Sequence, residues 1–134
     1  QAGCRVTVCA RTPEKAAALA ARCGGVTVSW EDLPRAAAEH GLLLNATPLG
    51  MEGSPEFESL DFVQALPTKA VVYDLVYHPT DTALLRAAGS RELTAVGGLA
   101  LLVQQAALAF AHFTGIVPDA ALCRNILQEL EAAQ

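Results

Sequence analysis

The chain has 134 residues, of which 52% are hydrophobic and 17% are charged. This length suits one domain with its own core or a part of a larger one, and so many apolar side chains exclude intrinsic disorder. Fourteen acidic residues against nine basic ones give a formal charge of −5. That balance argues against a nucleic-acid partner, because neutralising phosphates needs clustered Lys and Arg.

The cysteines and histidines point to no metal site. Cys4, Cys9, Cys23 and Cys123 contain no C-x-x-C spacing, and the three histidines are far apart. Reduced thiols acting as small hydrophobes fit the cytosol, so we expect a cytoplasmic protein. Residues 93–118 carry no Asp, Glu, Lys or Arg, but glycines, glutamines and a histidine interrupt the run. We therefore expect a buried helix there and no membrane partner.

Short β-rich runs alternate with Ala-rich helical segments along the chain. Strands are expected at residues 5–10, 26–29, 42–45, 70–74 and 93–96, and helices at 13–22, 30–40, 60–66, 82–88, 99–113 and 119–132. Three of the four residues at 42–45 are leucines, an apolar run typical of strands that are buried on both faces. Strands joined by helices of this length predict a parallel sheet with right-handed crossovers.

The expected fold class is therefore α/β, with a doubly wound parallel, Rossmann-like sheet. Residues 1–96 would form the βαβ units and residues 97–134 two C-terminal helices. Such a domain normally opens with a strand and a Gly-rich turn. Here Gln1 and Ala2 look like the end of a helix that Gly3 stops. We expect a truncated domain that lacks its first strand and its Gly-rich loop.

The end of the first expected strand carries two cations beside a helix start. In dinucleotide-binding folds this place meets the adenosine ribose, where an Asp or Glu selects NAD. Here it offers Ala10, Arg11 and Thr12, with Lys15 one turn further on. A guanidinium pairs well with a 2′-phosphate, and the hydroxyl and the helix N-terminus add donors, so these residues favour NADP. From these residues alone, a helix cap flanked by two solvated cations is slightly favoured over a phosphate site, because such caps are common.

Two further strand ends carry polar side chains. Asn45 and Thr47 follow the third expected strand, and Asp74, Tyr77 and His78 follow the fourth. Ligands of open α/β sheets bind at such ends. Tyr77 could donate to a substrate oxygen, and His78 could act as an acid or base. Each candidate also has a structural alternative. Asn45 and Thr47 could close a turn with their side chains, His78 could be an exposed loop histidine beside a proline, and Asp74 could accept hydrogen bonds from loop amides.

The last candidate lies at the start of the expected helix at 99–113. The glycine pair 97–98 permits close backbone approach to a ligand. Gln105 shares a helical stripe with Leu101 and Leu108, and a glutamine in so apolar a helix needs a polar partner. Either Gln105 binds a ligand, or one of Gln104 and Gln105 faces water while the other caps a backbone group.

Together these four segments resemble the C-terminal, NADP-binding half of shikimate dehydrogenases. The similar segments, in the family's order, are residues 10–15, residues 45–51 (Asn-Ala-Thr-Pro-Leu-Gly-Met), residues 73–79 with the following Thr82, and residues 98–107 with the Thr-Gly-x-x-Pro stop at 114–118. Three positions depart from the family pattern. Ala10 replaces the usual Asn, Gly97 a common Asp and Leu101 a common Met.

The resemblance implies reversible reduction of 3-dehydroshikimate to shikimate with NADPH, a step of the shikimate pathway that leads to the aromatic amino acids. It implies that Arg11, Thr12 and Lys15 hold the 2′-phosphate of NADP, with Ala10 on the adenosine side. A complete member would be an NADP-dependent oxidoreductase, and a homodimer is compatible with the resemblance.

For the other end of the cofactor, the resemblance implies that Asn45 and Thr47 lie near the nicotinamide. The backbone of Leu75 and of Gly98 would contact that ring.

The substrate-binding residues implied by the resemblance are Tyr77 and Gln105. No residue of this chain is expected to be catalytic, because the family's catalytic Lys and Asp belong to an N-terminal substrate domain. The chain is therefore expected to be inactive alone, with that missing domain as its partner. An apolar patch on the helices at 99–113 and 119–132 would dock it.

The family's sheet order places the absent strand between the strands at 5–10 and 42–45. Without it, the two halves of the sheet must close the gap or leave ladder groups unpaired.

Other functions stay open on the sequence. One is a non-catalytic NADP-binding or regulatory module. Another is a different doubly wound enzyme, of the methylene-tetrahydrofolate or glutamyl-tRNA dehydrogenase type, or a quinate dehydrogenase of the same family. Tyr77 and Gln105 favour a polyhydroxylated ring acid but do not separate shikimate from quinate.

Overall fold

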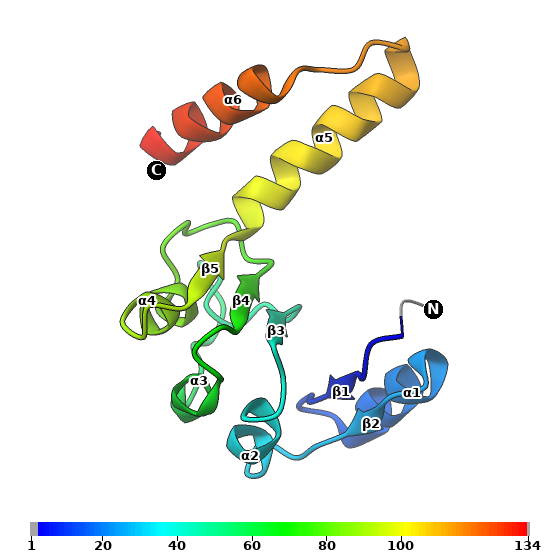
Figure 1. Cartoon of the computed structure of the whole chain (residues 1–134), viewed down its shortest axis with the longest axis vertical. Coiled ribbons are helices and arrows are strands. Elements are labelled where there is room, and N and C mark those ends of the chain that lie inside the picture. Colours follow the sequence, from blue (N-terminus) through cyan, green and yellow to red (C-terminus); the bar gives the residue numbers. More distant parts are fainter. Residues whose placement is uncertain (1–2, 134) are drawn as a thin grey trace. The chain divides into compact units, whose positions relative to one another are not determined.

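The computed structural model describes residues 3–133, in which strands and helices alternate up to β5 and two helices follow (Figure 1). In chain order the elements are β1 (Thr7–Val8), α1 (Pro13–Cys23), β2 (Val26–Thr27), α2 (Leu33–Ala37), β3 (Leu42–Asn45), α3 (Asp61–Ala65), β4 (Val71–Asp74), α4 (Ala83–Gly89), β5 (Thr94–Val96), α5 (Gly98–Thr114) and α6 (Ala120–Ala132). Each expected element is present, most of them one to three residues shorter or longer at an end.

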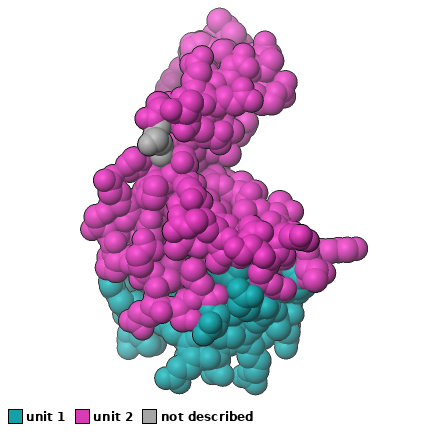
Figure 2. Space-filling view, turned by 90° about the vertical axis from the view of Figure 1, so that its left-hand side faces the viewer, with its two compact units in different colours: residues 1–41, 61–67 teal, residues 42–60, 68–134 magenta. Residues whose placement is uncertain are grey.

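The chain divides into two compact units (Figure 2). The first unit comprises Gln1–Gly41 and Asp61–Pro67, and the second comprises Leu42–Leu60 and Thr68–Gln134. The first therefore holds β1, α1, β2, α2 and α3, and the second holds the remaining elements. That residues 1–134 form a single truncated domain stays a prediction.

All strand pairs of the described residues are parallel, which confirms that part of the sequence prediction. The strands form two sheets. In the first unit β1 pairs with β2, with Thr7 opposite Val26. In the second unit the order is β3-β4-β5, with Asn45 opposite Asp74 and Tyr73 opposite Val96. This register puts the carboxyl ends of β3 and β4 side by side.

Helix α1 begins and ends where the sequence predicts. Thr12 occupies the N-cap position with extended backbone, and Pro13 is the first helical residue. Gly24 ends the helix with a φ of +69°, a left-handed conformation that favours glycine. Ala16 and Ala20 lie one turn apart on the buried face. The hydroxyl of Thr12, however, makes no capping hydrogen bond.

Helix α2 is much shorter than the expected helix at 30–40. The hydroxyl of Ser29 accepts from the amide of Asp32, so residues 29–32 form a turn and the helix starts only at Leu33. At the other end, the amides of Glu39 and His40 donate to carbonyl groups three residues earlier in the chain, which is the 3₁₀ pattern common at the ends of helices.

The core of the second unit lies around β4. Val72 and Asp74 are fully buried, and α4 contributes the buried Leu84 and Ala88. The prediction that β3 is buried on both faces is wrong for this structure. Leu42 and Leu44 are 56% and 51% exposed, so the face on which they lie is not covered, whereas Asn45 on the opposite face is buried.

Helices α5 and α6 pack together within the second unit. Gly115 ends α5 with a φ of +74°, and Asp119 caps α6 by accepting from the amide of Leu122 at 2.7 Å. Within residues 3–133, no helix combines the length and the apolar character needed to cross a membrane.

Candidate functional site

The carboxyl end of β3 turns sharply, and side chains close the turn. The Oδ1 atom of Asn45 accepts from the backbone amide of Thr47 at 3.0 Å and from its hydroxyl at 2.7 Å. That hydroxyl in turn accepts from the amide of Leu49 at 3.2 Å. The Nδ2 group of Asn45 donates to the carbonyl of Leu49 at 3.2 Å. The turn closed by Asn and Thr side chains is therefore present.

The carboxyl end of β4 holds a buried carboxylate with three donors. Asp74 is fully buried, and its Oδ1 atom accepts from Asn45 Nδ2 at 2.9 Å and from the amide of Val76 at 3.1 Å. Its Oδ2 atom accepts from the hydroxyl of Thr82 at 2.7 Å. A buried carboxylate is costly unless hydrogen bonds satisfy it, and these donors meet that need. Asp74 is thus an acceptor for a loop amide, as the sequence suggested.

Thr82 is the member of this cluster that the sequence reasoning missed. The sequence assigns it only the start of a helix, and it does cap α4 by accepting from the amide of Leu85 at 3.2 Å. The same hydroxyl donates to Asp74, so one buried group ties β4 to α4. The only sequence signal is a Thr at a helix start eight residues after the strand-end aspartate.

Gly98 lies against the chain that leaves β4. Its amide donates to the carbonyl of Val76 at 3.1 Å, and a β-carbon built on Gly98 would lie 2.2 Å from the carbonyl oxygen of Leu75. The amide of Leu75 in turn donates to the carbonyl of Asn45 at 3.0 Å. The structure therefore brings three predicted cofactor positions, Asn45, Leu75 and Gly98, to one edge of the second unit's sheet. Thr47 joins them through Asn45.

The two predicted substrate residues are both exposed. Tyr77 follows β4 at the same edge and is 50% exposed. Gln105 is exposed on α5, two helical turns after Gly98, and within residues 3–133 neither its side chain nor that of Gln104 makes a hydrogen bond. Neither glutamine therefore caps a backbone group, so that alternative is wrong.

His78 is exposed beside Pro79, as its structural alternative predicts. Its Nε2 atom pairs with the carboxylate of Glu52, and its carbonyl accepts from the amide of Glu52 at 3.1 Å. The histidine thus joins the loop after β4 to the loop after β3.

The two cationic residues predicted to bind a phosphate belong to the first unit. Arg11 and Lys15 are exposed at the start of α1, and among the described residues neither takes part in an ion pair. Thr12 between them is half-buried with its hydroxyl unused by the helix. The first-turn amides of α1 have no intrahelical acceptor, as at every helix start. Ala10, which precedes these residues, is half-buried.

The thiol of Cys9 lies next to this cationic end of β1. Partial burial raises the pKa of the Cys9 thiol above its ordinary value of 9.0. The thiol therefore stays protonated at neutral pH and is a poor nucleophile. In the part of the chain that the structure describes, no group of three or more His, Cys, Asp or Glu side chains is arranged to hold a metal ion.

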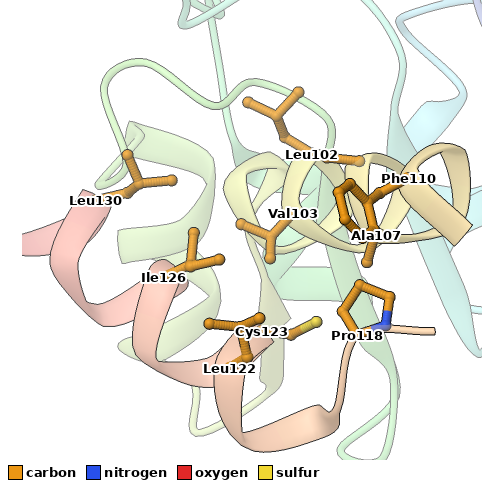
Figure 3. Close-up of a pocket in the computed structure, with 10 residues that line it drawn as sticks. Leu102, Val103, Ala107, Phe110, Pro118, Leu122, Cys123, Ile126 and Leu130 are labelled. Atoms are coloured by element: carbon orange, nitrogen blue, oxygen red, sulfur yellow. The ribbon is translucent and has the colours of Figure 1, made fainter. Parts of the chain in front are cut away.

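Helices α5 and α6 expose a large apolar surface, as predicted for a docking patch. The expectation of a buried helix within residues 93–118 is wrong for this structure, because only Gly98, Leu99 and Val103 of α5 are buried. Leu108 is 73% and Phe113 84% exposed, and Phe110, Leu122 and Ile126 are exposed as well. A groove of about 370 Å³ lies between the two helices, and side chains from both point into it (Figure 3). Its lining is apolar and includes Leu102, Val103, Phe110, Leu122, Cys123 and Ile126. We call these residues, with Leu108 and Phe113, the apolar face.

Parallel strands that alternate with helices, and polar side chains gathered at the carboxyl ends of β3 and β4, define an α/β domain of the Rossmann-like class. Comparison with known proteins agrees. The protein-family model for the shikimate 5′-dehydrogenase C-terminal domain matches residues 98–128 of this chain. The shikimate dehydrogenase (NADP(+)) of Acidiphilium cryptum is 46% identical over 131 residues, which are 96% of this chain and 47% of the relative.

Two solved structures are similar over nearly the whole chain. Shikimate 5-dehydrogenase from Thermus thermophilus in complex with NADP(H) and shikimate has a TM-score of 0.77 and 36% identity, covering 96% of this chain and 47% of that one. Quinate dehydrogenase from Corynebacterium glutamicum in complex with NAD has a TM-score of 0.77 and 29% identity, covering 93% and 46%. The chain belongs to the shikimate dehydrogenase family and matches its C-terminal part. It spans about half the length of the curated relatives that it matches.

Proposed function

We propose that this chain is the NADP-binding half of a shikimate dehydrogenase, which reduces 3-dehydroshikimate to shikimate reversibly. The observation that carries the proposal is the 46% identity with the shikimate dehydrogenase (NADP(+)) of Acidiphilium cryptum over 96% of this chain. No residue of the chain is assigned an acid or base role in it. Those roles belong to the part of the relatives that this chain does not match.

The cationic corner of the first unit supports NADP as the cofactor. Arg11 and Lys15 are exposed and not ion-paired within residues 3–133, so no ion pair has to break before they bind a phosphate. The hydroxyl of Thr12 is not used by α1 and could donate to a phosphate oxygen. No Asp or Glu lies at Ala10, where an NAD-selecting acid would be expected. These residues would hold the 2′-phosphate.

The edge formed by β3 and β4 supports a nicotinamide position in the second unit. Gly98 has no side chain, so the backbone of Leu75 and of Gly98 together offers a surface that a planar ring can approach. When bound, NADPH would supply the hydride for the substrate's carbonyl carbon. The exposed Tyr77 and Gln105 would hydrogen-bond to substrate oxygens, which orients the carbonyl relative to this edge.

The apolar face supports a docking role for α5 and α6. Many exposed apolar side chains on two neighbouring helices are typical of a surface that a partner covers. The relatives are about twice as long as the matched region, and the occupant proposed for the face is the additional, substrate-binding part of such a protein.

A second candidate is quinate as the substrate. It is favoured by the similarity to the quinate dehydrogenase structure, which covers 93% of this chain. Tyr77 and Gln105 suit either polyhydroxylated ring acid. The cationic corner favours the NADP-dependent enzyme, because that structure is a complex with NAD.

The test fuses this chain to the N-terminal half of the Acidiphilium cryptum relative. We expect NADPH-dependent reduction of 3-dehydroshikimate, with NADH a poor replacement, and shikimate oxidised faster than quinate. Binding of NADPH without turnover of either acid would favour the non-catalytic module instead. A fusion that prefers quinate and NAD would make quinate dehydrogenase the better assignment.

A further inference from the structure

The peptide group between Leu75 and Val76 is held at both of its ends. Its N–H, on Val76, donates to the buried Asp74 Oδ1 atom at 3.1 Å. Its carbonyl, on Leu75, lies against Gly98, where an added β-carbon would meet it at 2.2 Å. Because a peptide group is planar and trans, the direction of its N–H fixes the direction of its C=O.

Asp74 is in turn held by groups from two other elements. Asn45 donates from the end of β3 at 2.9 Å and Thr82 from the start of α4 at 2.7 Å. The carboxylate therefore has little freedom to rotate, and a bond to a charged acceptor is stronger than one to a neutral acceptor.

The side chain of Asn45 is fully used within the protein. Its Nδ2 group donates to Asp74 and to the carbonyl of Leu49, and its Oδ1 atom accepts twice from Thr47. Only 6% of the residue is exposed. An amide has two donors and two acceptor positions, so none is left for a ligand.

We propose that Asp74 is a positioning residue that orients the Leu75 carbonyl toward the bound nicotinamide, and that Asn45 acts through Asp74 rather than by touching the cofactor. This inference rests on the proposed function, because it assumes that NADP binds at this edge. It assigns the Asn45–Asp74–Thr82 cluster to the nicotinamide end of the cofactor and gives it no part in binding the 2′-phosphate.

The test compares two ligands of the protein in which this chain is fused to the N-terminal half of the Acidiphilium cryptum relative. NADPH carries both the nicotinamide and the 2′-phosphate, whereas adenosine 2′,5′-bisphosphate lacks the nicotinamide and carries only the phosphate assigned to Arg11, Thr12 and Lys15. The variant Asp74→Asn keeps the shape of the side chain and removes its charge. We expect it to weaken NADPH by about tenfold, the scale of a lost hydrogen bond to a charged group, and to leave the bisphosphate unchanged. The control is Asp81→Asn, at an exposed aspartate paired with Arg86.

The possible results separate this inference from the function on which it rests. If Asp74→Asn weakens neither ligand, or weakens both equally, Asp74 is a structural residue and the inference is wrong. If the fused protein without substitutions binds neither ligand, the proposed cofactor is wrong, and the inference fails with it.

A second pair of variants covers the case in which Asp74→Asn does not fold. Thr82→Val removes one donor from Asp74, and Thr82→Ser restores it. We expect Thr82→Val to weaken NADPH but not the bisphosphate, and Thr82→Ser to recover the wild-type affinity. Loss of NADPH affinity in both Thr82 variants would also overturn the inference, because the hydroxyl would then not be the group that matters.

Discussion

Gly98 and Leu75 approach each other as only a glycine permits. A β-carbon on Gly98 would lie 2.2 Å from the carbonyl oxygen of Leu75 and 2.7 Å from that of Val76. Both neighbours are backbone atoms that other hydrogen bonds hold in place, since Leu75 donates to Asn45 and Val76 donates to Asp74. The start of α5 and the end of β4 therefore fit together only with glycine at this position.

The variant Gly98→Ala should consequently destabilise the protein. We expect a loss of roughly 1–3 kcal/mol in the free energy of unfolding, the usual cost of forcing extra atoms into a packed site. The matched control is Gly97→Ala, because the nearest atom to an added β-carbon there is Leu85 Cδ1 at 3.5 Å, an ordinary contact. Urea denaturation of both variants measures the difference. Equal stability of the two would contradict the close packing.

The variant Arg11→Ala should separate the two nicotinamide cofactors. Losing a hydrogen-bonded guanidinium should weaken NADPH by roughly 1.5–3 kcal/mol and leave NADH nearly unchanged, because NADH has no 2′-phosphate. Titration of the variant with each cofactor provides the measurement. Arg22→Ala serves as the control, since Arg22 is also exposed on α1 but lies in its last turn. Equal weakening of both cofactors would mean that Arg11 only shapes the loop.

The variant Gln105→Ala should act on the substrate and not on the cofactor. In the fused enzyme we expect a higher KM for shikimate with an unchanged affinity for NADP, because the exposed amide would lose its hydrogen bonds to substrate hydroxyls. Gln104→Ala is a close control, since the neighbouring glutamine is equally exposed but points to another side of α5. A KM that changes as much in the control as in Gln105→Ala would count against the assignment.

Local sequence signals predicted the helix ends well. Thr12 and Pro13 lie at the start of α1, and Gly24 and Gly115 end α1 and α5, because these residues act through their own backbone preferences. The same signals failed for α2, where Ser29 and Asp32 form a competing turn through a side chain.

The candidate site depended on contacts that local patterns do not contain. The sequence identifies Asn45 and Asp74 singly as strand-end residues, but their hydrogen bond follows from the register of β3 and β4. The role of Thr82 needed the position of α4. Similarly, an apolar run predicted that β3 is buried, whereas the exposure of Leu42 depends on which elements cover that face.

The raised pKa of the Cys9 thiol predicts how stability changes with pH. The folded state favours the protonated thiol. Its contribution to the free energy of unfolding is therefore full at pH values below the ordinary pKa of 9.0, and it is lost as pH rises through the higher pKa of the folded state. When the pH is raised from below 9.0 to above it, the free energy of unfolding of the wild type should therefore fall more than that of Cys9→Ala. Parallel pH profiles for the wild type and Cys9→Ala would contradict the burial of this thiol.

The apolar face should make the isolated chain associate with itself. Exposed apolar area favours contacts that remove it from water, and Leu108 and Phe113 are its most exposed members. Changing both to Gln should lower the association measured by sedimentation without lowering the free energy of unfolding, since neither side chain is buried. Leu19→Gln, at a leucine of α1 that is 52% exposed, is the control and should leave association unchanged. In the fused enzyme the double variant should instead reduce activity, because the face would no longer hold the substrate-binding part. A wild-type chain that is monomeric and melts cooperatively would be evidence against this docking role.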